Sequence, residues 1–73
     1  MRPEIQIACD RVRVNIRRIR KEKKLTGEVV ADRVGISRPF YTQLEGGARR
    51  MSLRYLVGIA YALGVRPGKL LDG

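Results

Sequence analysis

Apolar residues recur at helical spacing over the first third of the chain. They fall at steps of three and four, which places them on one stripe of a helix. The stripe consists of Ile5, Ala8, Cys9, Val12, Ile16 and Ile19. This spacing predicts a helix over 3–24. Pro3 suits the first turn of that helix, whereas Asp10 would cap a later start, so two beginnings are consistent with the pattern.

Small polar residues and glycines divide the rest of the chain into short segments. A Ser or Thr oxygen accepts a hydrogen bond from an unpaired N–H of the first helical turn, and glycine ends a helix in the left-handed conformation without a Cβ clash. The expected N-caps and stops are Thr26 with Gly35, Ser37 with Gly46-Gly47, and Ser52 with Gly64. We therefore expect helices over 27–34, 38–46 and 53–63, and a short fifth helix over 68–71 that Pro67 opens.

This order of elements predicts an all-α fold, a compact five-helix bundle that forms one domain over 1–73. The chain has 44% hydrophobic residues, enough for a single core. Because no apolar run is typical of a signal peptide or a membrane span, we expect a cytoplasmic protein with no membrane partner. The single cysteine, Cys9, fits a reducing compartment, and its apolar neighbours favour a buried side chain.

The composition is strongly basic. Sixteen Lys and Arg stand against seven Asp and Glu, which gives a net charge of +9, and residues 1–24 carry nine of the cations and three of the acids. Such a surplus is typical of a nucleic-acid binder, although a domain with one solvated cationic face would have the same composition. The chain has no histidine, no Cys/His metal set and no glycine-rich phosphate loop. We therefore expect neither an enzyme nor a metal, cofactor or small-molecule ligand.

The segments 27–34 and 38–46 are separated by only three residues. Helices joined so tightly cross at about 90–120° and do not lie antiparallel. Apolar positions face the core on both sides of this corner, with Ala31 at the close approach; they are Val30, Val34, Ile36, Tyr41 and Leu44. The polar side of the second segment then points outward, and such a helix fits the major groove of B-DNA, which is about 12 Å wide.

These residues resemble the Cro/repressor-type helix-turn-helix family of bacterial and phage DNA-binding regulators. The resemblance covers nearly the whole chain, in the family's order and spacing. It is carried by "NIRRIRKEKKLT" (15–26), "VVADRVGISRPFYTQLEGG" (29–47) and "SLRYLVGIAYALGV" (52–65). The branch of small restriction–modification controller proteins is similar in length and in "SRPFYTQLE". The resemblance implies a phage-repressor-type bundle whose helix-turn-helix spans about 27–46.

The resemblance also assigns roles on the recognition helix. Arg38 and Gln43 stand where the family reads bases, since an arginine fork matches guanine O6 and N7 and a glutamine amide matches adenine N6 and N7. A phosphate contact for Arg38 and a solvated amide for Gln43 are the alternatives. Thr42 and Pro39 are further base-reading candidates, through contact with a thymine methyl; a phosphate contact is the alternative for Thr42. The candidates for the DNA backbone are Gly27, Ser37, Phe40, Arg49 and Arg50; Phe40 either stacks on the DNA backbone or packs on its own helix.

Several positions differ from the family pattern or have structural roles in it. Gly27 replaces a glutamine that braces the second helix on a phosphate, and Lys24 replaces a glycine, which predicts a positive φ. Arg50-Met51 replaces Asn-Pro before the fourth helix. Arg20 and Glu45 match the family's ion pair between the first helix and the end of the third, so we interpret both as structural.

The implied function is sequence-specific binding of double-stranded DNA by a homodimeric transcription regulator. In the family, two recognition helices enter successive major grooves of a palindrome, about 34 Å apart. The expected dimerisation segment is 61–73, through Val65, Leu70 and Leu71; closing the bundle is the alternative role of these residues. Two other functions stay open. A partner-binding tail would indicate an antitoxin-like interaction module, and binding insensitive to sequence would indicate a non-specific nucleoid or RNA binder.

Overall fold

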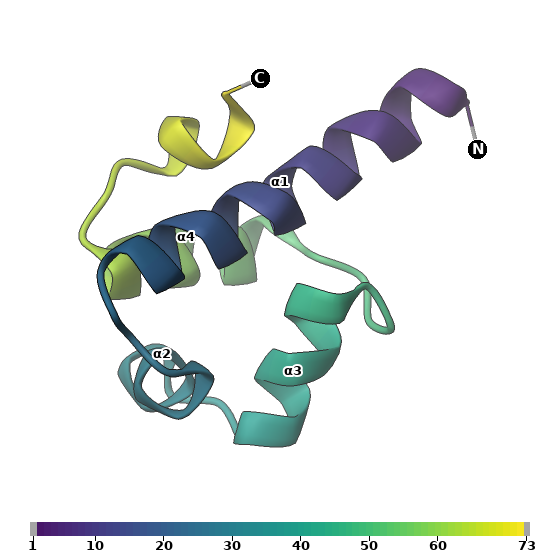
Figure 1. The fold of residues 1–73 in the computed structure, drawn as a ribbon. Helices are drawn as coiled ribbons and strands as arrows, with labels where there is room; N and C mark the ends of the chain where they lie inside the picture. The colour runs from purple at the N-terminus through teal and green to yellow at the C-terminus, as the bar shows by residue number, and fades with distance from the viewer. Residues whose placement is uncertain (1, 73) are drawn as a thin grey trace.

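A computed structural model of the chain describes residues 2–72. The elements are α1 (Pro3–Glu22), α2 (Gly27–Val34), α3 (Arg38–Gly46), α4 (Leu53–Leu63) and the 3-10 helix η1 (Pro67–Leu71), with no strand among the described residues (Figure 1). The all-α class is as expected, but the bundle has four α-helices and not five. The predicted fifth helix is a 3-10 helix of five residues, because so short a segment closes with i→i+3 bonds, such as that from the N–H of Lys69 to the oxygen of Arg66 at 2.9 Å.

The boundaries of α2, α3 and α4 are set by local capping. Each helix begins after a hydroxyl residue whose oxygen accepts a hydrogen bond from the N–H three residues on; these N-caps are Thr26, Ser37 and Ser52. Each helix ends at a glycine with positive φ; these are Gly35, Gly47 and Gly64. The three helices therefore begin and end where the sequence predicts.

Helix α1 begins at Pro3, not at Asp10, and ends at Glu22, two residues before the predicted end. The chain turns at Lys24, whose φ of 57° confirms the positive value expected there. A left-handed conformation at a residue with a Cβ costs about 1–2 kcal/mol. The N–H of Leu25 donates to the oxygen of Arg20 at 3.0 Å, which closes this turn.

The core lies where α1 and α4 meet the α2–α3 pair. Its largest fully buried side chains are Val30, Tyr41, Leu44, Ile16, Ile59, Leu63 and Leu70. Asn15 is also buried, and its Nδ2 donates to the backbone oxygens of Leu70 at 2.9 Å and Asp72 at 2.6 Å. The side-chain amide of Asn15 thus links η1 to α1.

This arrangement corrects one expectation about dimerisation. Leu70 is fully buried in the core of its own protomer, so it closes the bundle and its side chain is not available to a second copy. Val65 is half-buried against the same core. Of the three residues predicted at a dimer surface, only Leu71 is exposed, at 57%.

The N-terminal part of α1 extends beyond the rest of the bundle (Figure 1). None of residues 2–11 is buried; we call this segment the α1 arm. Cys9 is only half-buried, in contrast to the buried side chain that its neighbours in sequence favoured. None of the described helices combines the length and the apolar character needed to cross a membrane.

Candidate nucleic-acid interface

The outward face of α3 depends on the corner between α2 and α3. In Figure 1, α2 is seen end-on while α3 runs across the view, so the two helices cross steeply. The backbone oxygen of Ala31 accepts from the N–H groups of Gly35 at 2.9 Å and Ile36 at 3.1 Å, and Ala31 itself is fully buried. Because Tyr41 and Leu44 are buried on the inner side of α3, the polar residues between them face solvent.

The exposed side of α3 carries the predicted base-reading residues together: Arg38, Pro39, Thr42 and Gln43. The Arg38 side chain is 69% exposed, and its Nη1 lies 3.8 Å from Oε2 of Glu28, which is also exposed. An ion pair of this length in water restrains the side chains only weakly. Arg38 is therefore free to leave Glu28 for a base or a phosphate.

Gln43, Arg49 and Phe40 form one cluster at the other end of this face. The Nε of Arg49 donates to Oε1 of Gln43 at 3.0 Å, and its guanidinium carbon lies 4.3 Å from the centre of the Phe40 ring. The Phe40 ring in turn lies 5.0 Å from the ring of Tyr55. Arg49 thus holds the glutamine oxygen on one side, which leaves the Nε2 donors and one lone pair of Oε1 for another partner.

Cations surround a hollow of about 470 Å³ between α1, the start of α2, and α3. Four of its lining residues are Arg17, Arg20, Lys24 and Arg38. Gly27 also lines this hollow. A Cβ at this position would lie 3.3 Å from Cε2 of Tyr41, so the glycine makes room for the tyrosine ring. The backbone of Gly27 is therefore the only part of this residue that can meet a phosphate.

The floor of the hollow is a network around Glu45. Arg20 donates from Nε and Nη2 to the two carboxylate oxygens, both at 3.0 Å, and Arg17 adds a bond from Nε at 3.2 Å. The Tyr41 hydroxyl donates to the same carboxylate. Arg20 also donates to the backbone oxygen of Leu25 at 3.0 Å, which joins α1 to the start of α2. The network therefore fixes α3 against α1.

The ionisation of this network follows from its contacts. Burial by itself raises the pKa of Glu45, but hydrogen bonds from Arg20, Tyr41 and Arg17 outweigh it, so the pKa lies below its ordinary value. The bond to Glu45 raises the pKa of Arg20. Burial, and then the bond to Glu45, raises the pKa of Tyr41. The carboxylate is thus charged, and the phenol neutral, at physiological pH.

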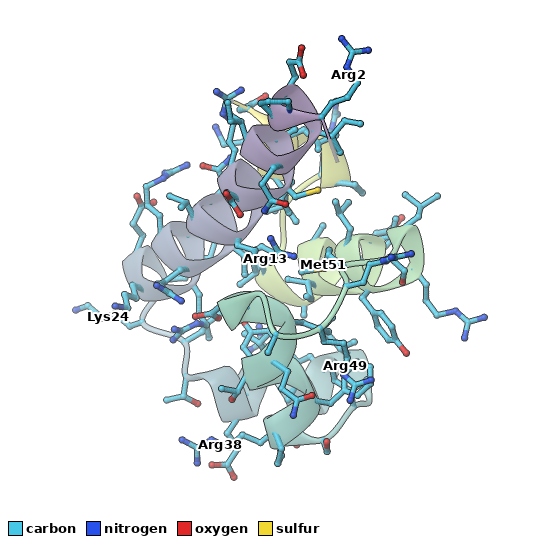
Figure 2. All side chains as sticks on the ribbon, turned by 90° about the vertical axis from the view of Figure 1, so that its right-hand side faces the viewer. Arg2, Arg13, Lys24, Arg38, Arg49 and Met51 are labelled. Carbon is cyan, nitrogen blue, oxygen red and sulfur yellow. The ribbon has the colours of Figure 1, made fainter. Side chains whose placement is uncertain are left out.

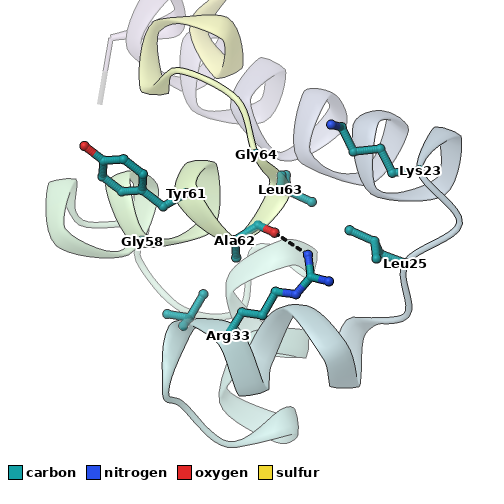
Figure 3. Close-up of a pocket in the computed structure, with 9 residues that line it drawn as sticks. Lys23, Leu25, Arg33, Gly58, Tyr61, Ala62, Leu63 and Gly64 are labelled. Carbon is teal, nitrogen blue, oxygen red and sulfur yellow. Dashed lines mark hydrogen bonds between the residues drawn. The ribbon is translucent and has the colours of Figure 1, made fainter.

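A second hollow lies between the end of α1, α2 and α4 (Figure 3). Arg33 crosses it and donates from Nη1 to the backbone oxygen of Ala62 at 2.9 Å, the bond drawn in Figure 3. A Cβ at Gly58 would lie 3.3 Å from Cγ1 of Val34, so the absence of a side chain lets α4 approach α2. These contacts hold α2, and with it the corner, on the bundle.

Comparison with known proteins agrees with this geometry. The helix-turn-helix domain family matches the chain over residues 12–72. The chain belongs to this helix-turn-helix family. An uncharacterized HTH-type transcriptional regulator of Bacillus subtilis (strain 168), YqaE, is 42% identical to it over 59 residues, which are 81% of this chain and 51% of that protein. The chain thus spans about half the length of this curated relative.

A solved structure supports the same assignment. The restriction–modification controller protein C.AhdI from Aeromonas hydrophila superposes with a TM-score of 0.78 at 29% identity, covering 85% of this chain and 94% of that one. The Cro/C1-type helix-turn-helix resemblance seen in the sequence is therefore confirmed. The chain is a member of a family of DNA-binding transcriptional regulators.

Several contacts around the helix-turn-helix had no clear signal in the sequence. The approach of Glu28 to Arg38 and of Arg17 to Glu45 depends on how two helices cross. The contact between Arg49 and Gln43 depends on a loop that turns back after α3. The remaining backbone candidates, Ser37 and Arg50, are exposed.

Proposed function

We propose that the chain binds double-stranded DNA in a sequence-specific manner, as a homodimeric transcription regulator acting on a palindromic operator. The observation that carries this proposal is the outward face of α3. Arg38 and Gln43 are both exposed there, on a helix whose inner side is anchored in the core. Their side chains have the donors and acceptors that suit guanine and adenine in the major groove.

The cations on both sides of α3 support contacts with the DNA backbone. Arg17 and Lys24 line the hollow along one side of α3, and Arg49 and Arg50 lie in the loop beyond its end. Phosphate contacts on two sides fix the register of a recognition helix, while base contacts select the sequence. We assign these four residues to contacts with the DNA phosphates, and Arg49 also orients Gln43.

The short length of α3, nine residues, favours binding to DNA by two copies of the chain. One such helix contacts only a few base pairs, so a useful operator needs a second copy on a second half-site. In helix-turn-helix dimers, the half-sites lie about 10 base pairs apart, centre to centre. We therefore propose two copies on a palindrome.

Selection of bound duplexes from a random pool tests this function. We expect enrichment of a palindrome with half-sites about 10 base pairs apart. The net charge of +9 also favours a second candidate, a non-specific nucleoid-type binder. That candidate predicts no enrichment over rounds of selection, and such a result would reject the proposed function.

A further inference from the structure

The α1 arm has one apolar side that its own protomer leaves uncovered. Ile5 is 49% exposed and lies two turns before the buried Val12, on the same stripe of the helix. Ile7 is 56% exposed and points to the opposite side, because two residues along a helix turn the side chain by about 200°. The arm therefore offers two isoleucines of similar exposure on opposite faces.

The stripe of Ile5 continues into an apolar groove. The groove is lined by Ala8, Cys9 and Val12 of α1 and by Met51, Leu56 and Leu71 from the last third of the chain. Met51, labelled in Figure 2, lies just before α4, and the groove brings it beside α1. Contiguous apolar surface of this kind marks an interaction site in a small protein. The arm and the groove form a single surface.

The distribution of charge indicates which molecule covers the arm and the groove. Within the arm, Arg2 and Arg11 balance Glu4 and Asp10, so its side chains carry no net charge, while the chain as a whole carries +9. Two copies of so cationic a chain repel each other over most of their surface, and they meet with least repulsion where the charge is balanced. Nucleic acid and acidic partners, by contrast, are attracted to the cationic faces.

We infer that a second copy of this chain covers the arm and the groove. In the pair, the two α1 arms pack antiparallel around a two-fold axis near Cys9. This places Ile5 of one copy against the groove of the other copy, and the reverse contact follows from the symmetry. The inference rests on the proposed dimeric function. Of the residues expected at the dimer interface, the inferred contact includes Leu71, which is exposed, and excludes Leu70, which is buried; the arm supplies the rest.

The position of the arm is compatible with DNA binding. In Figure 2, Arg2 at the tip of the arm and Arg38 at the start of α3 lie at opposite ends of the molecule. Pairing through the arms therefore leaves the outward face of α3 uncovered in both copies. A standard interface buries about 800 Å² on each partner. That is about a sixth of the accessible area of the whole chain, which is 5003 Å².

The matched pair Ile5→Glu and Ile7→Glu tests the surface by sedimentation equilibrium. Both variants place the same charge at similar exposure on the same helix. We expect the dimer dissociation constant to rise at least about tenfold for Ile5→Glu, and to stay within about twofold of the wild type for Ile7→Glu. Equal effects of the two substitutions, or a wild-type chain that stays monomeric at high concentration, would overturn the inference.

Disulfide crosslinking through the single cysteine, Cys9, provides a second test. It uses the wild-type chain and so needs no substitution that weakens the interface. Two Cys9 residues near the axis should form a disulfide-linked dimer under mild oxidation. The control carries Cys9→Ser and Val14→Cys; Val14 is 64% exposed on the opposite side of α1. We expect several-fold more covalent dimer from the wild type than from the control. The same yield from both would contradict pairing through this face.

A DNA measurement separates this inference from the proposed function. On a duplex with one half-site, Ile5→Glu should bind with wild-type affinity, and on the full palindrome it should lose cooperative binding. If the wild type selects a sequence but behaves as a monomer, the pairing inference fails and the reading of DNA stands. If the chain dimerises through Ile5 but selects no sequence, the proposed function fails and the contact stands.

Discussion

Arg38 and Glu28 face each other on the exposed surface at 3.8 Å, too far apart for a strong bond. Replacing Arg38 by alanine should lower the affinity for the selected palindrome by about 1–3 kcal/mol for each half-site and relax the choice at one base pair. The measurement is binding to the palindrome and to duplexes changed at each position.

The control for Arg38 is Arg18→Ala, which removes the same charge from an exposed arginine that pairs with Glu22 along α1. It should weaken all duplexes equally and only slightly. If Arg38→Ala also weakens every duplex by the same factor, Arg38 contacts a phosphate and reads no base.

Arg49 orients Gln43 by a directional hydrogen bond, in addition to any effect of its charge. Arg49→Lys keeps the charge but loses the Nε bond to Gln43 and the planar stack on Phe40. We expect nearly unchanged affinity for non-specific DNA and a loss of discrimination at the base pair that Gln43 reads. A double-mutant cycle with Gln43→Ala measures this coupling, and an additive result would show that Arg49 contacts DNA independently.

The sequence predicts which residues α3 exposes, but it does not predict how they pair. Exposure follows from helical period, since Tyr41 and Leu44 fix the inner side. The Arg49–Gln43 contact depends on the path of the loop after Gly47, and the Glu45 network depends on the approach of α1 to α3. The missing side chain at Gly27 is visible in the sequence, whereas its cause, the Tyr41 ring, is visible only in three dimensions.

At the scale of single helices, two glycines form a natural comparison. A Cβ at Gly46, the last residue of α3, meets nothing within 4 Å, while a Cβ at Gly27 meets the ring of Tyr41 at 3.3 Å. Gly46→Ala should therefore raise the free energy of unfolding by about 0.5–1 kcal/mol. Gly27→Ala should lower it by about 1 kcal/mol, because Tyr41 is buried and bonded to Glu45 and cannot move aside.

Urea unfolding of both variants tests this difference. A gain of stability for Gly27→Ala equal to that for Gly46→Ala would show that the tyrosine ring yields, and that the glycine is not needed for packing.

Local signals explain why α2, α3 and α4 are predictable and why the two chain ends are less so. The three helices have a hydroxyl N-cap and a terminal glycine, which fix their limits within a few residues. The end of α1 has neither, because Lys24 adopts a conformation that glycine usually supplies. The segment after Pro67 is too short for sequence to distinguish an α-helical turn from a 3-10 turn.

At the scale of the whole molecule, the Glu45 network makes the free energy of unfolding depend on pH. The pKa of Glu45 is lower in the folded chain than in the unfolded chain. Its contribution is therefore complete above about pH 5, and it is lost as the pH falls through the folded-state pKa. Glu45→Gln should cost about 2 kcal/mol at pH 7, since it leaves Arg20 largely buried without its carboxylate.

Unfolding in urea at pH 7 and at about pH 3 tests the acid dependence. The difference in stability between the wild type and Glu45→Gln should shrink at the lower pH. A difference that stays constant would mean that the carboxylate contributes by its shape and not by its charge.

The amide of Asn15 has a consequence for how the chain is made. Asn15 lies in the first helix, and both of its acceptors, the oxygens of Leu70 and Asp72, belong to the last residues described. During synthesis α1 therefore leaves the ribosome before the segment that supplies these two acceptors. A chain truncated after residue 66 should therefore be cut by proteases faster than the chain that includes 67–72, because Asn15 and the apolar stripe of α1 lose their contacts with η1.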